Sequence, residues 1–389
     1  MPCLRGLMIS RLAIFGSGPV AHCAALTAHM LGFDAHLVED DMAPTTLWPG
    51  PDPRAWSLRA ASLAFLRHLG LSLTSCAPVT SVEVWHSDAA GTPLEGHLHF
   101  TGSPTRPLAG IIPAPDLRTQ IQTHLDKAKI RRSRRPLGDP FVLRDQIGAD
   151  LALICDSLWM AHLPPSQRPK MVGWPYGHVA FTAPVTLGRD HEQTARQVFL
   201  PSGPLALLPL SDPRAASLIW SMVPRKAKAA QLRPDLAHQA SVALNLPLHF
   251  DPAALAQFPL HAHHARTYVG AGFAILGDGA HRIHPLAGQG LNLGFADIGA
   301  LFDTLVSARR VGADLSTSIT LQGYERRRRF QNEAMYAAMD QLKILFANNW
   351  GPLRLARGLG MHAFNASPLK THLQNWMSDE SALCEALIS

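Results

Sequence analysis

The sequence predicts an α/β fold, either in two lobes or as one core with a helical appendage. It indicates a parallel sheet with flanking helices, a mainly antiparallel sheet and a helical C-terminal region. Three observations favour this class. The 389 residues are 47% hydrophobic and only 16% charged, which is enough to bury more than one core. An apolar strand near the start runs directly into a glycine-rich turn. The central part of the chain alternates short apolar runs with proline and glycine, as antiparallel strands do.

The first predicted element is a strand at residues 11–15 (RLAIF), followed by a turn and a helix of small residues. The turn has the G-x-G-x-x-A form of the dinucleotide-binding fingerprint, in which Gly16 turns the chain and Gly18 lets a pyrophosphate meet the backbone. Ala21 keeps the helix close to the sheet, and the helix amino terminus presents its positive dipole end to phosphates. The residues predicted to bind the nucleotide here are Gly16, Gly18, Pro19, Val20 and Ala21.

The next predicted strand, at residues 35–38, ends at Glu39, about twenty residues after the turn. A carboxylate in that position accepts the hydroxyls of an adenosine ribose, and it suits a 2′-hydroxyl better than a 2′-phosphate. A mere tight turn and a solvated strand end would explain the same residues, so the fingerprint does not by itself decide the cofactor.

A second glycine-rich stretch, residues 277–294 (GDGAHRIHPLAGQGLNLG), follows an apolar strand at 273–276 and precedes a predicted helix. Such a density of glycine indicates that something approaches the backbone closely. A flat cofactor, a phosphate and a tight internal turn all satisfy that requirement.

Residues 277–297 (GDGAHRIHPLAGQGLNLGFAD) resemble the GD motif of the FAD-dependent aromatic hydroxylases, and within them the ubiquinone-biosynthesis branch. The resemblance extends over most of the chain and is also carried by Arg54 with Ser57, Leu58, Leu66, Leu69 and Gly70, by 113–118 (PAPDLR), 203–210 (GPLALLPL), 217–220 (SLIW) and 258–260 (FPL).

The resemblance implies a glutathione-reductase-type, Rossmann-like FAD-binding domain with an inserted, mainly antiparallel β-sheet substrate domain, as in p-hydroxybenzoate hydroxylase, and a C-terminal helical tail. We assign residues 1–80, 103–165 and 266–320 to the FAD-binding domain, 81–102 and 166–265 to the substrate domain, and 321–389 to the C-terminal helical region.

The resemblance also implies roles around FAD. Asp278 would bind a ribityl hydroxyl, and Gly277 would allow that close approach. The helix beginning near Gly288 would point its free N–H groups at the flavin's pyrimidine end, where negative charge develops on reduction. The predicted flavin-ring environment is Pro285, Gly288, Gln289, Gly290 and Asn292, and the further predicted cofactor contacts are Leu291, Arg54, Arg118 and Asp156.

The middle motif departs from the family pattern, which is A-D-G followed by a serine and an arginine. Here the chain reads Cys155-Asp156-Ser157, so the aspartate is kept, serine replaces glycine, and the arginine is absent. Because this motif supports both FAD and nicotinamide contacts in the family, either the use of NAD(P)H is altered or the protein is partly degenerate. We interpret Cys155 as an apolar filler of a buried strand in preference to a redox group.

No metal site is predicted. His281 and His284 have H-x-x-H spacing, but no glutamate follows His281 and no third ligand is evident. The histidines at 261, 263 and 264 are expected to face solvent or cap strands. The cysteines (Cys3, Cys23, Cys76, Cys155 and Cys384) contain no CxxC pair and predict no disulfide framework.

The segments 179–187, 197–209 and 216–223 predict antiparallel strands of a sheet that covers the flavin ring, although a packed structural sheet would look the same. Few charged side chains converge there, which favours an aromatic, largely apolar substrate. In the tail, apolar residues recur at helical spacing and predict a stripe packed on the FAD domain: Met335, Met339, Leu342 and Phe346. Residues 350–364 mix apolar side chains with Arg354 and Arg357, a mixture that suits a membrane surface.

We therefore expect an FAD-dependent monooxygenase that hydroxylates the ring of a polyprenylated phenol in ubiquinone biosynthesis through a C4a-hydroperoxyflavin, with NAD(P)H or another electron donor and no protein nucleophile. A catalytically silent FAD-fold accessory protein of a quinone-biosynthesis assembly and a flavin hydroxylase of a soluble aromatic compound are the alternatives.

Expected partners are a membrane surface and other quinone-biosynthesis proteins, but no nucleic acid. The net charge of +6 is mild, and the basic residues are scattered except at 326–329, so the charge by itself fits an anionic cofactor or a membrane surface as well as nucleic acid. No signal peptide and no apolar run of spanning length are evident. The lack of a disulfide framework favours a reducing cytoplasm, so we expect a cytoplasmic protein, peripheral at the inner face of the membrane. Met8, directly before the first strand, is an alternative start to Met1.

Overall fold

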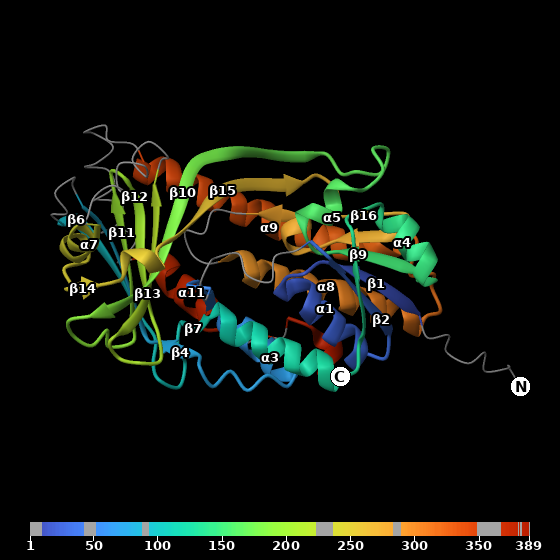
Figure 1. Ribbon diagram of the computed structural model, residues 1–389, viewed down its shortest axis with the longest axis horizontal. Helices are drawn as coiled ribbons and strands as arrows, with labels where there is room; N and C mark the ends of the chain where they lie inside the picture. Colours follow the sequence, from blue (N-terminus) through green and yellow to red (C-terminus); the bar gives the residue numbers. More distant parts are fainter. Residues whose placement is uncertain are drawn as a thin grey trace, which may run out of the picture.

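The computed structural model describes residues 10–42, 52–87, 93–222, 236–282, 289–347, 367–379, 381 and 383–388. These residues form a mixed α/β structure with two large sheets that lie at opposite ends of the molecule (Figure 1). A smaller sheet has three strands.

One large sheet has six strands in the order β16-β17-β9-β1-β2-β8. Its neighbours run parallel except for β16 and β17, which form an antiparallel edge pair. The strands β1 and β9 are apolar and almost wholly buried, as expected for inner strands of a parallel sheet. The strands are β1 (Arg11–Phe15), β2 (Asp34–Asp40), β8 (Arg131–Arg135), β9 (Leu151–Ile154), β16 (Val269–Gly270) and β17 (Phe273–Ile275). The predicted strands at 11–15 and 35–38 are therefore confirmed.

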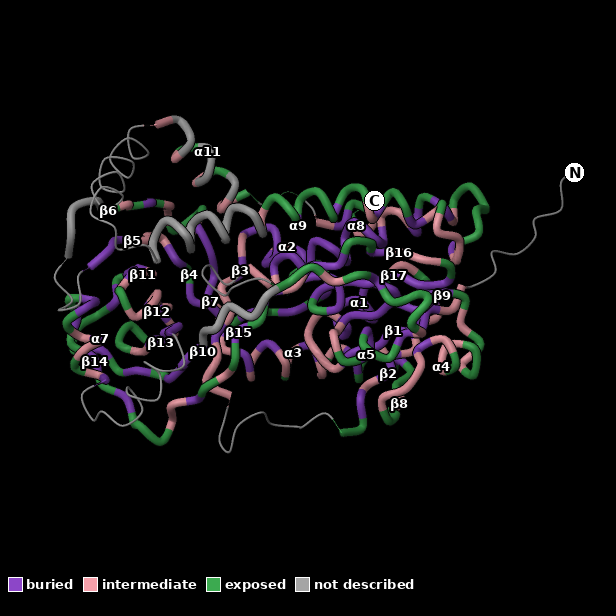
Figure 2. Tube along the Cα trace, turned by 90° about the horizontal axis from the view of Figure 1, so that it is seen from above, coloured by how far each residue is buried: buried purple, intermediate pink, exposed green. Residues whose placement is uncertain are grey.

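Helices cover this sheet and complete its core. The first helix of the chain packs against the long helix that follows the GD stretch, and Figure 2 shows a continuous buried region through them and β1. The helices are α1 (Pro19–Met30), α2 (Ala60–His68), α3 (Ala114–Lys127), α4 (Pro140–Ile147), α5 (Ser157–Ala161) and α8 (Gln289–Arg310). By length and composition α8 could cross a membrane, but 78% of its most apolar window is buried inside the protein, so it serves as a core helix.

The other large sheet has nine strands and is antiparallel except for the parallel pair β5–β11. Its main order is β18-β15-β10-β13-β12-β11-β5-β6, with β14 paired to β10, and α7 covers one face through a separate apolar core. The elements are β5 (Ser81–Ser87), β6 (Pro93–Thr101), β10 (Met171–Leu187), β11 (Thr194–Leu200), β12 (Gly203–Pro209), β13 (Ala215–Met222), α7 (Leu236–Leu244), β14 (Leu248–His249), the 3₁₀ turn η1 (Pro252–Ala254), β15 (Ala256–Ala265) and β18 (His281–Arg282). The predicted antiparallel strands are confirmed within the described residues, which end at 222 in the third segment, and the segment 197–209 is divided into two strands.

The GD stretch joins the two large sheets. Strand β17 belongs to the six-stranded sheet, β18 belongs to the nine-stranded sheet, and the short turn η2 (Gly277–Gly279) lies between them. The paired strands β10 and β15 extend from the nine-stranded sheet toward the six-stranded sheet (Figure 1). Turn η2 therefore lies where the chain passes from one sheet to the other.

The small sheet and the C-terminal helices complete the structure. The small sheet consists of β3 (Ala55–Leu58), β7 (Ala109–Pro113) and β4 (Ala77–Val79) in antiparallel pairs. Helix α9 (Ser318–Ala347) packs along α8, as the prediction of a helical tail requires. The last elements are α11 (Pro368–Met377) and η4 (Glu385–Leu387).

Two expectations for the tail fall largely outside the described part of the chain. Of the predicted apolar stripe, Met335 is half-buried, whereas the side chains of Met339, Leu342 and Phe346 are not described. Residues 350–364, predicted to suit a membrane surface, lie outside the described residues.

Candidate active site

The first glycine-rich turn leaves open backbone at the start of α1. Gly16 has φ +150°, and a Cβ there would lie 3.0 Å from the Cβ of Ala21. Gly18 precedes α1 as its N-cap, has no side-chain cap, and a Cβ at this position would meet nothing within 4 Å. Gly16 is therefore required by the fold, whereas Gly18 leaves space for a ligand beside a helix amino terminus.

The GD turn packs directly against that helix start. Gly277 has φ +51°, and a Cβ on it would lie 3.1 Å from Val20 of α1. A Cβ on Gly294 of α8 would lie 2.5 Å from the same valine. The predicted residue Val20 thus brings the two glycine-rich motifs, which are far apart in the sequence, into a single site.

Some of the remaining GD-motif residues leave room for a ligand, and others pack against the protein. Asp278 keeps its side chain 52% exposed, 3.7 Å from Arg282, so its carboxylate is accessible to a ligand. Gln289 and Gly290 begin α8 as predicted, and a Cβ on Gly290 would meet nothing within 4 Å. Leu291 packs partly buried against the main core.

Two predicted flavin contacts, Pro285 and Gly288, lie outside the described residues, so these contacts stay predictions.

Asn292 fixes the first turn of α8 to strand β3. Its Oδ1 accepts a hydrogen bond from the Arg59 amide at 2.9 Å, and its Nδ2 donates to the Ser57 carbonyl at 2.9 Å. The residue is only 1% exposed. These bonds give Asn292 a role in placing α8, and the predicted bond to the flavin stays a prediction.

Asp156 of the middle motif lies beside the first glycine turn. It is the N-cap of α5, where its carboxylate accepts from the Trp159 amide at 3.0 Å and from the Ser17 amide at 3.4 Å. Burial raises the pKa of Asp156, and those amide hydrogen bonds oppose the rise. Ser157 begins α5 without a positive φ, so replacing the family's glycine with serine costs little backbone strain here.

Glu39 is anchored by α1. Its Oε1 lies 3.0 Å from Nε2 of His22, and its side chain is 13% exposed. The hydrogen bond with His22 lowers the pKa of Glu39 against the opposing effect of burial. The carboxylate is therefore ionised and held at the end of β2, where the ribose of a dinucleotide is predicted.

Arg54 and Arg118 are brought together by a residue that the sequence did not single out. Asp52 Oδ2 lies 2.8 Å from a terminal guanidinium nitrogen of each arginine. Burial alone would raise the pKa of Asp52, but the hydrogen bonds and charges of the two arginines outweigh it and lower the pKa. The spacing of Asp52 and Arg54, two residues apart, could have indicated their ion pair, whereas the contact of Asp52 with Arg118 depends on the fold.

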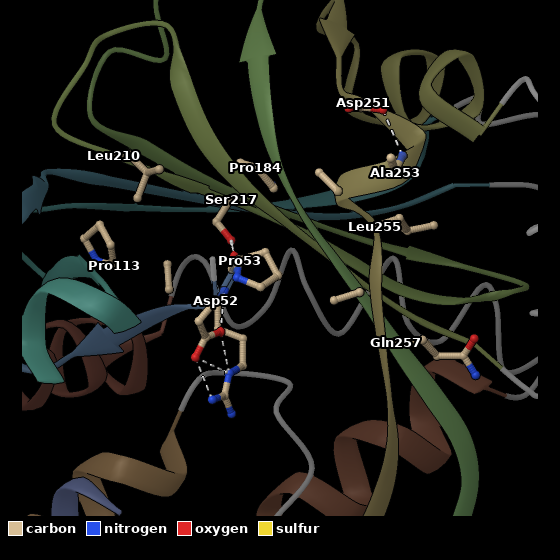
Figure 3. A pocket seen from close by; sticks show the side chains of 14 residues that line it. Asp52, Pro53, Pro113, Pro184, Leu210, Ser217, Asp251, Ala253, Leu255 and Gln257 are labelled. Carbon is tan, nitrogen blue, oxygen red and sulfur yellow. Dashed lines mark hydrogen bonds and ion pairs between the residues drawn. The ribbon is translucent and has the colours of Figure 1, made fainter. Parts of the chain in front are cut away.

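A cavity of about 570 Å³ lies between the small sheet and the nine-stranded sheet. Asp52 and Arg54 line one part of it, and Ser217 of β13 supplies a hydroxyl from the other sheet, 3.5 Å from the Pro53 carbonyl oxygen (Figure 3). Gln257 of β15 also lines the cavity. The remaining lining is mostly apolar: Pro53, Ala55, Pro113, Pro184, Leu210, Ala253, Ala254, Leu255 and Ala256, together with Asp251. This arrangement can remove an apolar ring from water and orient it with a few polar groups.

The histidines of β15 differ in their surroundings. His261 is exposed and His263 bonds to the Asp278 carbonyl, but His264 is 7% exposed and bonds to the Tyr268 hydroxyl. The expectation that His264 faces solvent or caps a strand is therefore wrong, because one face of β15 packs against Tyr268, which a run of histidines does not reveal.

Cys155 is buried, and burial raises the pKa of its thiol. A protonated thiol in a buried position agrees with the interpretation of Cys155 as an apolar filler.

His281, considered as a metal ligand, instead contacts the buried Asp297. Among the residues that the structure describes, no group of three histidine, cysteine or acidic side chains is placed to bind a metal ion. His284 lies outside the described residues.

Comparisons with known proteins agree with this geometry. A family model described as an FAD binding domain matches residues 168–338. The chain is 32% identical over 381 residues to the 3-demethoxyubiquinol 3-hydroxylase of Escherichia coli strain K12, a match that covers 91% of this chain and 94% of the relative. It is 39% identical over 248 residues to the ubiquinone biosynthesis monooxygenase COQ6 of Rattus norvegicus, which covers 53% of this chain and 52% of that protein.

Among solved structures, the chain is similar to p-nitrophenol 4-monooxygenase PnpA from Pseudomonas putida DLL-E4, with a TM-score of 0.70, 16% identity, and coverage of 97% of this chain and 98% of that one. The fold and the full-length match to the Escherichia coli hydroxylase show that this is an FAD-dependent monooxygenase, and the two open glycine positions at helix amino termini leave room for its cofactor. The match along nearly the full length of the Escherichia coli enzyme further shows that the chain belongs to the family of ubiquinone-biosynthesis hydroxylases.

The described residues fit FAD as the cofactor. Gly18 and Gly290 leave space at the amino termini of α1 and α8, where N–H groups and helix dipoles favour anionic groups. Glu39 is ionised at the end of β2, where the ribose is predicted, and Asp278 is accessible in the GD turn that packs against α1.

Proposed function

We propose that this protein hydroxylates the aromatic ring of a polyprenylated phenol in ubiquinone biosynthesis. The observation that carries the proposal is the cavity of about 570 Å³ between the small sheet and the nine-stranded sheet. Its volume is that of a typical small-molecule site, and its largely apolar lining suits a phenol ring with an apolar substituent. The name of the full-length relative, a 3-demethoxyubiquinol 3-hydroxylase, supports the same class of substrate.

We further infer a glutathione-reductase-type architecture. The six-stranded and three-stranded sheets would form the FAD-binding domain, and the nine-stranded sheet would form the substrate domain, with α9 and α11 as the helical tail. The glycine turn after β1 and the parallel pairing of β1 with β2 and β9 support this division. The boundaries at 81–102, 166–265 and 321–389 belong to the same proposal.

The chain's residues would hold the cofactor and the substrate without forming a covalent bond to either. FAD supplies the redox and oxygen-activating chemistry of ring hydroxylation. Gly18 and the first turn of α1 would bind its pyrophosphate, Glu39 its adenosine ribose, and Asp278 its ribityl chain. The amino terminus of α8 would stabilise negative charge at the flavin ring.

The cavity would position the phenol and exclude water. Its apolar walls remove the ring from solvent, which strengthens the few polar contacts made there. Ser217 lines the cavity from β13, and its hydroxyl donates to the Pro53 carbonyl at 3.5 Å, so its oxygen would accept a hydrogen bond from a ring hydroxyl. The ion pair of Arg54 with Asp52 closes one part of the cavity without leaving an unbalanced carboxylate.

We propose NAD(P)H as the electron donor. The middle motif, which departs from the family pattern at Ser157 and lacks the arginine, is the reason to test this proposal. Ser157 is accommodated in α5, so the loss of glycine is no obstacle to the fold. Rapid-mixing absorbance would show whether NADPH or NADH reduces the bound flavin. A flavin that only a protein or chemical reductant reduces would exclude nicotinamide as the direct donor.

We also propose that the protein is cytoplasmic and peripheral at the inner face of the membrane, alongside other quinone-biosynthesis proteins. The composition of residues 350–364 supports this location. Co-sedimentation with anionic liposomes should be lost when Trp350, Arg354 and Arg357 are replaced together. Equal sedimentation of both proteins would remove this segment from the proposal.

A deletion strain of the source organism tests the substrate class. We expect an unhydroxylated, polyprenylated quinone precursor to accumulate, and we expect the intact gene to restore the quinone. Normal quinone levels would contradict the proposal. A yellow, FAD-loaded protein that is needed for quinone synthesis but never turns over would instead be the accessory protein, and lipid-independent turnover of a soluble phenol would identify the third alternative.

A further inference from the structure

A fully buried carboxylate lies behind the GD turn. Asp297 of α8 is 0% exposed, and both of its oxygens have hydrogen-bond partners. Its Oδ2 accepts from the Gly277 amide at 3.0 Å and lies 2.5 Å from His281 Nε2. Its Oδ1 accepts from Arg328 Nε at 2.7 Å and from Asn332 Nδ2 at 3.2 Å. The carboxylate therefore connects the GD turn, β18, α8 and α9.

Every one of these four partners is a donor, and this explains the choice of side chain. A carboxylate is acceptor-only when ionised, so both of its oxygens can serve two donors each. An asparagine would present an NH₂ group to one pair of donors and would repel them. Burial alone would raise the pKa of Asp297, but His281 and Arg328 outweigh it and lower the pKa, which keeps the side chain ionised.

Arg328 provides the balancing charge and is itself held from several directions. Its side chain is 5% exposed, and its second terminal nitrogen donates to Asn332 Oδ1 at 2.8 Å and to the Leu293 carbonyl at 3.3 Å. Loss of this partner would be strongly destabilising, because the buried carboxylate would keep hydrogen bonds but lose the cation that balances its charge. Helix α9 thus contributes a required charge to a site assembled by α8.

The same hydrogen-bond network also reaches strand β15 of the nine-stranded sheet. Asn332 Nδ2 also donates to the Tyr268 hydroxyl at 3.1 Å, and that hydroxyl lies 3.0 Å from His264 Nε2 of β15. The connected groups therefore extend from α9 through Asp297 to β15 and β18 of the nine-stranded sheet.

Only one peptide unit separates this network from the predicted ribityl ligand. Gly277, whose amide Asp297 holds, directly precedes Asp278, whose carboxylate is half exposed. Gly277 also has φ +51° and packs against Val20 of α1, so the turn has little freedom once its amide is bonded. The position of Asp278 is therefore fixed by the contacts that Gly277 makes with the protein interior.

We propose that Asp297, hydrogen-bonded to Arg328 of α9, is a positioning residue that fixes the GD turn for FAD binding, and that α9 is therefore part of the cofactor site. This inference rests on the proposed function in so far as Asp278 binds FAD. It gives the C-terminal helical region a role beyond packing, because its first half supplies Arg328 and Asn332.

The test compares three purified variants with the wild-type protein. Asp297→Asn removes the second acceptor, and Arg328→Lys keeps the charge but not the guanidinium fork. Asp303→Asn is the matched control, because Asp303 lies on α8 as well but accepts from the Ala386 amide at 2.9 Å, away from the GD turn. FAD affinity is measured by quenching of flavin fluorescence in folded protein, with the folded fraction checked by circular dichroism.

We expect Asp297→Asn and Arg328→Lys to raise the Kd for FAD about tenfold or more, and Asp303→Asn to leave it unchanged. A second measurement needs no cofactor: hydrogen–deuterium exchange in the apo protein should accelerate at Gly277 in the first two variants and not in the control. A purely structural role would lower the melting temperature without moving either quantity in the folded fraction.

Three outcomes would overturn the proposal: an unchanged Kd and unchanged Gly277 exchange in folded Asp297→Asn, the same result in Arg328→Lys if Asp297→Asn fails to fold, or an equal effect of Asp303→Asn. If the wild-type protein binds no FAD, the proposed function fails, and the exchange measurement alone then decides whether Asp297 fixes the turn.

Discussion

Gly16 and Gly18 are two residues of one motif with separable roles. Gly16→Ala would place a Cβ at 3.0 Å from Ala21 in a backbone conformation that alanine rarely adopts, and we expect it to lower the free energy of unfolding by about 1–3 kcal/mol. Gly18→Ala meets no protein atom within 4 Å, so we expect unchanged stability but a Kd for FAD raised about tenfold, because the methyl group occupies ligand space.

Urea unfolding and FAD titration of both variants separate the two roles. Wild-type FAD affinity in Gly18→Ala would show that no phosphate approaches this residue. Unchanged stability of Gly16→Ala would show that the turn tolerates a side chain.

We expect His264 to make the stability of the protein sensitive to mild acid. Burial lowers the pKa of His264 from 6.5 to about 4, so the folded protein keeps it neutral. Between these two values the unfolded chain binds the proton and the folded chain does not, which means that stability is full above pH 6.5 and falls as the pH drops toward 4. His264→Gln should flatten the dependence of the unfolding midpoint on pH in this window. An equally steep fall in the variant would assign the effect to other groups.

The contact between α8 and β3 is a test of how one element is placed. Asn292→Leu would remove the hydrogen bonds that the buried Asn292 makes with the Arg59 amide and the Ser57 carbonyl. We expect the free energy of unfolding to fall by about 2 kcal/mol or more. Thr304→Val is the control on the same helix, since it removes only a bond to the Ala300 carbonyl within α8. Equal losses in both variants, measured by urea unfolding, would argue against a special role for Asn292.

In the loop before β3, the carboxylate of Asp52 forms ion pairs with two arginines. Asp52→Asn would leave Arg54 and Arg118 near each other without a carboxylate between them. We expect the two side chains to separate and the Michaelis constant for the phenol to rise several-fold, because Asp52 and Arg54 line the cavity. Steady-state kinetics at saturating FAD would measure this change. An unchanged Michaelis constant would place the ion pair outside the substrate site.

Local patterns in the sequence predict the parts of the fold and site that depend on neighbouring residues. The turn of Gly16 and Gly18, the strand at 11–15 and the start of α8 at Gln289 follow from short-range spacing of glycine and apolar residues. The resemblance carried by residues 277–297 predicts FAD as the cofactor in the same way, because the whole motif is one short segment.

The parts that the sequence does not predict arise from contacts between distant segments. Asp297 meets Arg328 and Gly277, and Asp52 meets Arg118, only because the chain folds these elements together. A histidine-rich strand carries no signal of the tyrosine that buries one of its histidines. The cavity combines residues from β3, β10, β13 and β15, and no sequence period connects them.

At the scale of the whole molecule, the cavity lies between two sheets, so a substitution in its wall should change substrate binding without changing FAD binding. Ala254→Trp would place a bulky ring at the cavity wall, at a partly exposed position where the fold can accept it. We expect the Michaelis constant for a polyprenylated phenol to rise about tenfold while the Kd for FAD stays unchanged. A change in FAD affinity without a change in the Michaelis constant would mean that this space holds part of the cofactor.

Transfer of oxygen to an apolar phenol defines the proposed activity, and isotopic labelling follows that transfer itself. Purified protein with FAD, a reductant and a polyprenylated phenol is incubated under heavy-isotope oxygen gas, and the extracted product is examined by mass spectrometry. We predict a ring-hydroxylated product that carries one heavy oxygen atom from the gas. A yellow protein that consumes reductant but returns the phenol unlabelled and unchanged would contradict the proposed activity.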